Sequence, residues 1–279
     1  MEIRSILLLG GSGFIGSHLA RRLSEQDFLV VIPTRRAERA KHLTLLPTVE
    51  VIEADVHDQK VLSDLASSAD TIINLIGILH SKSGVPYGPD FAQAHVALPQ
   101  KIAMACNDTA VQRLIHVSAL GAANDAPSEY LRSKADGEAA IQKAHAAWTI
   151  FRPSVVFGPD DKFLNVFAQL LHTFPILPLG GARARFQPVF VEDVVSAIVS
   201  SLTLSASFGH TYELAGPKIY SLLDLVHYVA ELIGRPRLIV PLPDGLAMLE
   251  AAILECLPGP LMNRDNMRSM QIDSIASGI

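Results

Sequence analysis

A tyrosine and a lysine four residues apart are the side chains of this sequence best suited to move a proton. On a helix, Tyr130 and Lys134 share one face about one turn apart. A phenol can donate or take a proton, and a neighbouring ammonium should lower the pKa of the phenol from about 10. Lys134 could also hold a cofactor ribose, and Ser118 could donate a hydrogen bond to a substrate carbonyl. These three residues predict a catalytic group; the alternative is a surface helix with an unrelated tyrosine and lysine.

A glycine-rich turn near the start of the chain could hold phosphate. Residues 7–16 read LLLGGSGFIG, so an apolar run ends in glycines that fit both G-x-G-x-x-G and G-x-x-G-x-x-G. Glycine is needed where the chain leaves a strand, where backbone approaches a pyrophosphate and where a helix packs on the strand. Amides at the start of the helix would then face the phosphates. The residues expected to contact a dinucleotide are Gly10, Gly13, Phe14, Ile15 and Gly16. A tight turn without a ligand is the alternative.

The residues after the second apolar run indicate which dinucleotide would bind. An NAD site usually places Asp or Glu there, on the ribose 2′-hydroxyl. Here Thr34 is followed by Arg35 and Arg36. Two guanidiniums suit a dianionic 2′-phosphate, and Thr34 could add a hydroxyl donor. The sequence therefore favours NADP(H) over NAD(H), although Arg39 and Lys41 leave a solvated basic loop as the alternative.

Two further strand ends should border the same crevice, because ligands lie outside the carboxyl ends of parallel strands. Asp55 and Val56 follow the third apolar run, and the Asp55 carboxylate could accept from an adenine amino group. Leu75, Ile76 and Gly77 end the fourth, where glycine lets backbone approach a ribose. A structural loop explains each segment equally well.

The elements that would position these residues alternate between strand and helix. Short runs that are apolar on both faces suit strands buried between helices, and segments of helical period separate them. This alternation predicts an α/β fold with a doubly wound parallel sheet of the Rossmann type. The six expected strands are Ile6 to Leu9, Leu29 to Ile32, Val49 to Ile52, Thr71 to Ile76, Leu114 to Val117 and Thr149 to Phe151.

The pattern changes after residue 151. Proline and glycine interrupt residues 153–188, and helical patterns resume at about 190–204 and 221–233. We expect a dinucleotide-binding domain over residues 1–152. A small, less regular C-terminal substrate domain would follow over residues 153–279, with part of it packed back on the first domain.

Composition excludes several classes of protein. The 279 residues carry a formal net charge of −5, which offers no basic footprint for nucleic acid. No run reaches the roughly 18 apolar residues that a membrane-spanning helix needs. Two cysteines cannot build a disulfide framework, and the ten histidines show no metal-ligand spacing, so no metal site is expected. The start of the chain lacks a signal-peptide pattern, and we expect a cytoplasmic location.

With these residues in view, the sequence resembles the extended short-chain dehydrogenase/reductases, which are NAD-dependent epimerase/dehydratase-like proteins. The glycine turn, Ser118 and the Y-x-x-x-K pair carry the resemblance, together with FRPSVVFGP, PVFVEDV and YELAGP, which begin at residues 151, 188 and 212. The segments NLIG, HVSA and YLRSKA, from residues 74, 116 and 130, look closest to an atypical branch. That branch includes the nucleotide-binding accessory subunit of respiratory complex I and its bacterial relatives. The resemblance implies a Rossmann domain that binds NADP(H), with a small C-terminal domain over the nicotinamide.

Two positions depart from the family pattern. His95 stands where the family has an asparagine, and Ala119 follows Ser118 in place of a second hydroxyl residue. An imidazole cannot copy an amide, but it could hold a water. The site would keep its acid/base pair and lose one member of its proton relay, which weakens the expectation of turnover and leaves that of cofactor binding intact.

A very apolar helix is expected over residues 245–257. Leu246, Leu249, Ile253, Leu254 and Leu257 form a broad stripe, for which core packing ranks first, a protein partner second and a membrane third. Three functions follow for the whole chain. The first is an NADP(H)-dependent oxidoreductase acting on a small carbonyl or alcohol substrate. The second is a dinucleotide-binding subunit of a respiratory or quinone-related assembly, peripheral to the membrane through a partner. The third is a sugar-nucleotide epimerase or dehydratase.

Overall fold

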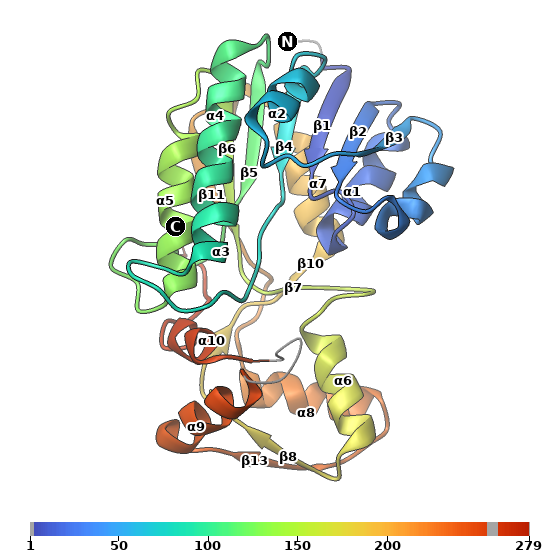
Figure 1. Cartoon of the computed structure of the whole chain (residues 1–279). Helices are drawn as coiled ribbons and strands as arrows, with labels where there is room; N and C mark the ends of the chain where they lie inside the picture. The colour runs from blue at the N-terminus through green and yellow to red at the C-terminus, as the bar shows by residue number, and fades with distance from the viewer. Residues whose placement is uncertain (1–2, 256–261, 279) are drawn as a thin grey trace.

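A seven-stranded parallel sheet forms the centre of the protein. The computed structural model describes residues 3–255 and 262–278. The strand order is β11-β6-β5-β4-β1-β2-β3, and every neighbouring pair is parallel (Figure 1). The strands are β1 (Ser5–Leu9), β2 (Leu29–Thr34), β3 (Val49–Glu53), β4 (Thr71–Asn74), β5 (Arg113–Val117), β6 (Ala147–Pro153) and β11 (His210–Leu214). The order reverses between β1 and β4, as in a Rossmann sheet, so the predicted fold class is confirmed.

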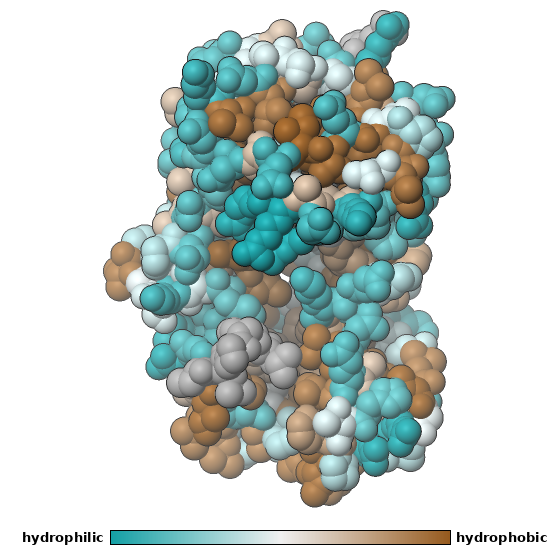
Figure 2. Space-filling model, turned by 45° about the vertical axis from the view of Figure 1, so that its right-hand side comes forward, coloured by the Kyte–Doolittle hydropathy of each residue, from teal (hydrophilic) through white to brown (hydrophobic). Residues whose placement is uncertain are grey.

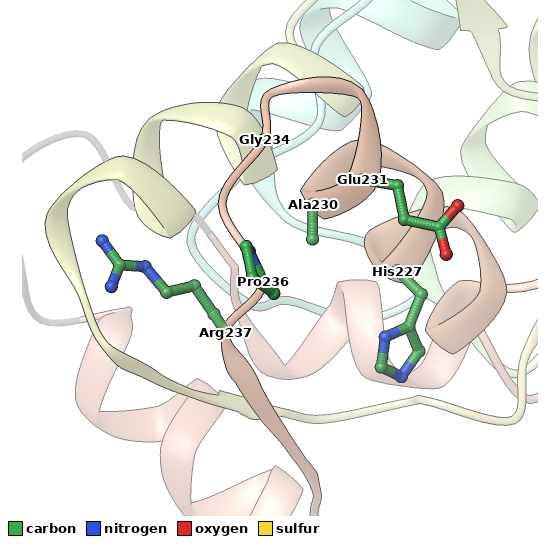
Figure 3. A pocket seen from close by; sticks show the side chains of 6 residues that line it. All are labelled: His227, Ala230, Glu231, Gly234, Pro236 and Arg237. Carbon is green, nitrogen blue, oxygen red and sulfur yellow. The ribbon is translucent and has the colours of Figure 1, made fainter.

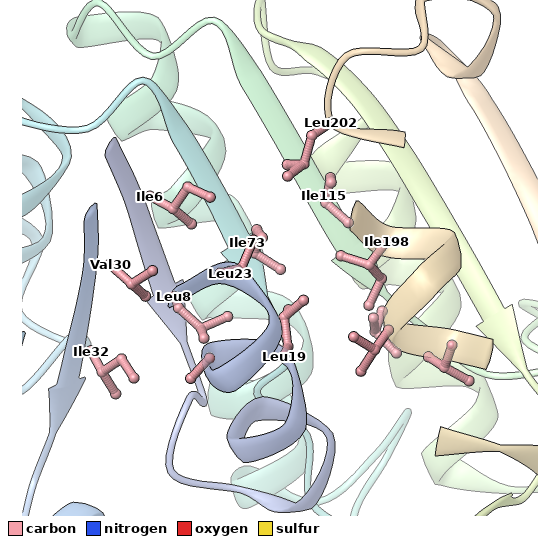
Figure 4. Packing of buried hydrophobic residues seen from close by; sticks show 14 of the residues in the cluster. Ile6, Leu8, Leu19, Leu23, Val30, Ile32, Ile73, Ile115, Ile198 and Leu202 are labelled. Carbon is pink, nitrogen blue, oxygen red and sulfur yellow. The ribbon is translucent and has the colours of Figure 1, made fainter. Parts of the chain in front are cut away.

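Helices cover both faces of this sheet, which explains why its central strands β1 and β4 are almost entirely buried. In β1, Ile6 and Leu8 pack toward one face, and Leu7 and Leu9 pack toward the other. Figure 4 shows the first of these clusters, in which Leu19 and Leu23 lie beside Ile198 and Leu202. Helices α1 (Phe14–Ser24) and α7 (Val191–Ser201) cover this face, and α2 (Gln59–Ala66), α4 (Leu98–Asp108) and α5 (Glu129–Ile141) cover the opposite one.

Part of the second half of the chain belongs to the Rossmann layers. Strand β11 pairs with β6 in parallel, with His210 opposite Thr149. Helix α7 packs on α1, and His18 Nδ1 lies 2.7 Å from Glu192 Oε1 across this contact. The layers therefore extend beyond residue 152. Shorter elements complete this part of the fold: the 3₁₀ helices Ala37–Leu45 and Ser205–Ser207, α3 (Pro89–Phe91) and a π-helical turn, Ala92–Ala97.

The remaining elements form a small lobe below the sheet in Figure 1. Its core packs α6 against α8 through Phe167, Leu171, Leu222 and Val226. Three two-stranded sheets join it: β7 with β10, β9 with β12, and β8 with β13. The elements are β7 (Val156–Phe157), α6 (Leu164–Thr173), β8 (Ile176–Leu179), β9 (Arg185–Phe186), β10 (Val189–Phe190), β12 (Tyr220–Ser221), α8 (Leu222–Leu232), β13 (Leu238–Pro241), α9 (Asp244–Leu254) and α10 (Arg264–Ser269). Throughout residues 3–255 and 262–278, helices long and apolar enough to cross a membrane are absent.

The apolar helix near the end of the chain does not bury the stripe expected of it. Helix α9 packs on α10 through its small residues Ala247 and Ala251, which are fully buried. Leu246, Leu249 and Ile253 are 54%, 58% and 60% exposed, so the expected core packing is wrong for these three side chains. Brown, apolar surface gathers at this lower end of the molecule in Figure 2. Leu257, the last residue of the expected stripe, lies outside the described residues.

Candidate functional site

The glycine turn between β1 and α1 leaves no room for larger side chains. Gly10 has a φ of +82°, a backbone conformation that glycine adopts readily. A Cβ on Gly16 would lie 2.3 Å from Gly10 O, and one on Gly10 would lie 3.1 Å from Ile76 N. The Gly13 N–H donates to Gly10 O at 3.0 Å, which closes the turn.

Helix α1 begins at Phe14 without a side chain to cap it. Gly13 is the N-cap residue and supplies no side-chain hydrogen bond, and the first turn contains no acidic residue. The amides of Phe14, Ile15 and Gly16 therefore have no acceptor from the helix itself. A helix start with unpaired amides and a positive dipole end suits an anion. The turn thus fits the diphosphate of a dinucleotide.

The backbone after β4 connects this turn to the predicted catalytic residues. Strand β4 ends at Asn74, two residues earlier than expected, because Asn74 Oδ1 accepts the Ile76 N–H and redirects the chain. Leu75 and Ile76 then lie against Gly10. A Cβ on Gly77 would lie 3.7 Å from His95 Nε2 and 4.0 Å from Lys134 Nζ. Residues 75–77 therefore lie against the glycine turn at one end and near Lys134 at the other.

Lys134 and Ser118 lie where β5 ends. Lys134 is 3% exposed, and its Nζ donates to Val117 O at 2.8 Å. Burial lowers the pKa of Lys134 to about 8, with nearby Glu138 opposing the shift. Ser118 is also buried, and its Oγ has no hydrogen-bond partner within the described part of the chain. A buried hydroxyl without a partner is rare, and a substrate oxygen would satisfy it.

Tyr130 stands at the start of α5 with its ring among aromatic side chains. Its centroid lies 6.0 Å from that of Phe91 and 5.5 Å from that of His95. Burial raises the pKa of Tyr130 to about 12. The expected lowering by Lys134 is therefore wrong for this structure, because removal of the phenol from water disfavours the phenolate. At neutral pH the phenol is a proton donor.

His95, the departure from the family pattern, is fully engaged by protein. The Ile78 N–H donates to His95 Nε2 at 3.0 Å, so the ring proton lies on Nδ1. Nδ1 then donates to Ser133 Oγ at 2.9 Å, and that hydroxyl donates to Tyr130 O. Burial, aided by Lys134, lowers the pKa of His95 to about 2 and keeps the ring neutral. The expectation that His95 holds a water is wrong, since both nitrogens have protein partners.

A second histidine, His116, lies near Lys134 and His95, and the sequence analysis did not propose it as a site residue. Asn74 Nδ2 donates to His116 Nδ1 at 3.0 Å, so the ring proton lies on Nε2. That nitrogen is buried and finds no partner among residues 3–255 and 262–278. Burial, with contributions from Lys134 and His95, lowers the pKa of His116. In the sequence, the HVS segment indicated only a family resemblance. Because side chains alternate between the two faces along a strand, His116 and Ser118 lie on the same face.

The carboxyl ends of β2 and β3 carry charged residues of both signs. Arg35 and Arg36 are exposed, and Thr34 is buried. The Thr34 hydroxyl donates to Arg36 O at 3.2 Å and so shapes this turn. The sequence had suggested that this hydroxyl is free to donate to a ligand, and here it is not. Burial lowers the pKa of His57, Asp55 opposes the shift and Arg35 adds to it, which places both side chains within electrostatic range of the imidazole.

The two residues predicted to contact the cofactor after β3 differ in their exposure to solvent. Asp55 is exposed, and its Oδ1 accepts the His57 N–H at 3.0 Å. Val56 is 7% exposed and packs in the core on the α2 and α4 side of the sheet. Of these two, only the Asp55 side chain is open to a ligand.

Comparison with known proteins shows which family the chain belongs to. Residues 6–215 match the sequence model of the NAD dependent epimerase/dehydratase family. The chain belongs to this family. It has the NAD(P)-binding Rossmann fold of the NAD dependent epimerase/dehydratase family, which confirms the resemblance noted in its sequence.

The proteins that this chain resembles differ in function by their names. The chain is 32% identical to NADH dehydrogenase [ubiquinone] 1 alpha subcomplex subunit 9, mitochondrial, from Arabidopsis thaliana, over 97% of its own length and 70% of the relative's. It is 26% identical to ceramide reductase from Caulobacter vibrioides, over 90% and 77%. Among solved structures, UDP-glucuronic acid 4-epimerase from Bacillus cereus, in complex with UDP-glucuronic acid and NAD, matches with a TM-score of 0.72 and 21% identity, over 96% of this chain and all of that one.

A surface hollow elsewhere is not a second candidate for the functional site. It has a volume of about 390 Å³ and lies on the small lobe, beside α8. Figure 3 shows His227 and Glu231 on consecutive turns of α8, while the Arg237 guanidinium points away from both. Arg237 Nε instead donates to Leu171 O at 3.0 Å. The hollow therefore lacks convergent polar groups.

The buried lysine predicts a pH-dependent stability. Its folded-state pKa of about 8 is below the ordinary value of 10.5, so the folded protein releases this proton first as the pH rises. The unfolded chain then binds more protons, and the free energy of unfolding of the wild type relative to Lys134→Met should rise by about 2 kcal/mol between pH 7.5 and 10. Urea unfolding at four pH values measures this difference. Lys143→Met is the control for deletion of an exposed lysine, and parallel wild-type and Lys134→Met curves would contradict the prediction.

Proposed function

We propose that this protein is an NADP(H)-dependent oxidoreductase that interconverts a carbonyl and an alcohol. The observation that carries the proposal is the position of residues 75–77, which lie against the glycine turn and near Lys134, together with the buried Ser118 hydroxyl that has no partner among the described residues. These groups lie at the carboxyl ends of the strands where the sheet reverses its order, which is where open α/β folds bind ligands.

The residues proposed to hold the dinucleotide follow the edge of the sheet. The α1 amides and glycine turn would bind the diphosphate, Asp55 the adenine and Lys134 the nicotinamide ribose. The full set is Gly10, Gly13, Phe14, Ile15, Gly16, Thr34, Arg35, Arg36, Asp55, Val56, Leu75, Ile76, Gly77 and Lys134, with Thr34 and Val56 contributing through the shape of the backbone. When bound, the nicotinamide exchanges a hydride with the substrate carbon.

The proposed proton chemistry uses three side chains. Tyr130 gives its phenolic proton to the carbonyl oxygen as the carbon becomes an alcohol carbon. Ser118 Oγ donates to the same oxygen and thereby satisfies its own buried hydroxyl. The Lys134 ammonium stabilises the phenolate that Tyr130 becomes. In the reverse direction the phenolate takes the alcohol proton.

A direct test uses purified protein with NADPH and an aldehyde or quinone probe, such as 4-nitrobenzaldehyde or phenanthrenequinone. Calorimetry should detect NADPH binding, and absorbance at 340 nm should fall when the probe is added. Binding without turnover of any probe would overturn the enzymatic proposal and favour the second candidate below. Absence of binding by both NADPH and NADH would overturn both.

The preference for NADP(H) is proposed from Arg35 and Arg36. Exposed guanidiniums at the end of β2 would bind the 2′-phosphate through charge-assisted hydrogen bonds. Changing both to serine should weaken NADPH binding by about 10- to 100-fold and leave NADH binding within about threefold. Arg39→Ser, on the adjacent turn, is the matched control. Equal affinity of the unaltered protein for NADPH and NADH would show the assignment to be wrong.

The second candidate is a dinucleotide-binding subunit of a larger assembly. The exposed Leu246, Leu249 and Ile253 favour it, because three large apolar side chains on one helix face are costly to leave in water. The Arabidopsis relative is named as a subunit of NADH dehydrogenase. We propose that α9 docks on a protein partner and holds the chain at the membrane periphery through it.

This docking predicts the outcome of one substitution. Leu249→Glu should abolish co-sedimentation with the membrane fraction of the native cell and should leave NADPH binding unchanged. Met104→Glu, an exposed apolar residue on α4, is the control. Unchanged co-sedimentation of Leu249→Glu, or a wild-type protein found wholly in the supernatant, would contradict the role of α9.

A further inference from the structure

The short helix α10 lies against the start of the helix that carries Tyr130. Figure 1 places α10 directly below α3 and the lower end of α5, and the two helices α10 and α5 are in contact. A capping box between Asn263 and Asn266 defines the start of α10. This part of the chain lies beyond residue 215, where the family match ends.

Asp265 on α10 binds the first amides of α5. Its Oδ1 accepts the Glu129 N–H at 2.8 Å, and its Oδ2 accepts the Tyr130 N–H at 2.9 Å. Ser128 Oγ accepts the next amide, that of Leu131, at 3.2 Å. Asp265 is only 7% exposed, so these charge-assisted hydrogen bonds are shielded from water. A carboxylate at this end of α5 also interacts favourably with the helix dipole.

The same helix also fixes the loop that follows Gly77. Asn266 Nδ2 donates to Leu79 O at 3.3 Å. Glu129, whose own amide binds Asp265, accepts the Gly84 and Gly88 amides through Oε2 at 3.1 and 2.9 Å. Arg268 on α10 lies 3.8 Å from Glu129 Oε1. Helix α10 thus joins the backbone of Tyr130 to the loop that follows Gly77.

We propose that Asp265 is a positioning residue that sets the location of the Tyr130 phenol. This inference rests on the proposed function, in which Tyr130 exchanges the proton. Tyr130 is the second residue of α5, where helices fray, and its backbone is held from outside the helix by one carboxylate. Small displacements of a proton donor are costly to the rate, so loss of this carboxylate should reduce turnover without removing any group that touches the dinucleotide.

The test compares Asp265→Asn with Asp273→Asn. The amide introduced by Asp265→Asn keeps one acceptor oxygen, so the fold should be preserved, and Asp273 is a carboxylate of the same terminal segment that pairs with Arg185 and not with α5. Hydrogen exchange at the amides of Glu129 and Tyr130 should accelerate by about 10- to 100-fold in Asp265→Asn. With ¹³Cζ-labelled tyrosine, the Tyr130 signal, assigned with Tyr130→Phe, should move while those of Tyr212, Tyr220 and Tyr228, on β11, β12 and α8, stay. With a reducible carbonyl probe, kcat should fall at least about tenfold with an unchanged Kd for NADPH.

The outcomes separate this inference from the proposed function. Unchanged exchange and an unchanged Tyr130 signal in Asp265→Asn would overturn the role of Asp265, whether or not the protein binds NADPH. Altered exchange and signal with wild-type kcat would also overturn it, because the position of the phenol would then not matter. Failure of the unaltered protein to bind NADPH would overturn the proposed function, while exchange and the tyrosine spectrum would still report whether Asp265 positions Tyr130.

Discussion

Replacing Tyr130 with phenylalanine should lower kcat for carbonyl reduction by about 10²- to 10⁴-fold. The phenylalanine ring can keep the packing against Phe91 and His95, so only the hydroxyl is lost. Because burial raises the pKa of Tyr130 to about 12, the wild-type phenol is protonated at neutral pH and supplies the proton that the variant lacks. Stopped-flow or steady-state absorbance at 340 nm measures the loss, and calorimetry should show the Kd for NADPH within about twofold of wild type.

The control for this substitution is Tyr228→Phe. Tyr228 lies on α8 and is 54% exposed, so the loss of its hydroxyl should change neither kcat nor the free energy of unfolding. Turnover of Tyr130→Phe at the wild-type rate would remove Tyr130 from the chemistry. A parallel loss of NADPH binding would instead indicate that the hydroxyl supports the cofactor site and not the proton transfer.

The parts of the molecule that depend on local sequence were predictable. Apolar runs of three to six residues predicted the strands, because apolar side chains are buried between the helix layers. The glycines at residues 10, 13 and 16 predicted the turn that follows β1, because sterics favour glycine there. The edge of the sheet that gathers the candidate site follows from the order of these strands. Strand β11 was not predicted, since four of its five residues, His210 to Glu213, are exposed and its run is not apolar.

The features that depend on partners distant in sequence were not predictable. Arg113 was not singled out from the sequence, yet it is fully buried and donates to Ser201 O, 88 positions away, and to Thr149 Oγ1. The ring nitrogens of His95 are occupied by the Ile78 amide and by Ser133, contacts that no spacing rule contains. Likewise, Asp265 accepts a hydrogen bond from the Tyr130 amide, 135 positions away in the sequence. Each is a polar group whose role is set by the tertiary fold, and hydrophobic periodicity carries no information about it.

Replacing Gly16 with alanine should abolish measurable NADPH binding, with a loss of at least about 100-fold in affinity. The added Cβ would lie 2.3 Å from Gly10 O and 2.6 Å from Gly11 Cα, which are backbone atoms of the turn itself. Helix α1 must then move away from the turn, so the amides proposed to bind the diphosphate leave their positions. Overpacking of this kind should also reduce the free energy of unfolding by about 1–3 kcal/mol.

Gly245→Ala separates this effect from the general cost of altering a glycine. Gly245 lies in the first turn of α9, where an added Cβ meets nothing within 4 Å, and alanine should there stabilise the helix by up to about 1 kcal/mol. Urea unfolding and calorimetry with NADPH on both variants give the two quantities independently. If Gly16→Ala folds and binds NADPH as the wild type does, the diphosphate does not lie at the start of α1, since the displaced amides would then be irrelevant to binding. A dinucleotide bound elsewhere would also leave Lys134 without the nicotinamide ribose that it is proposed to hold.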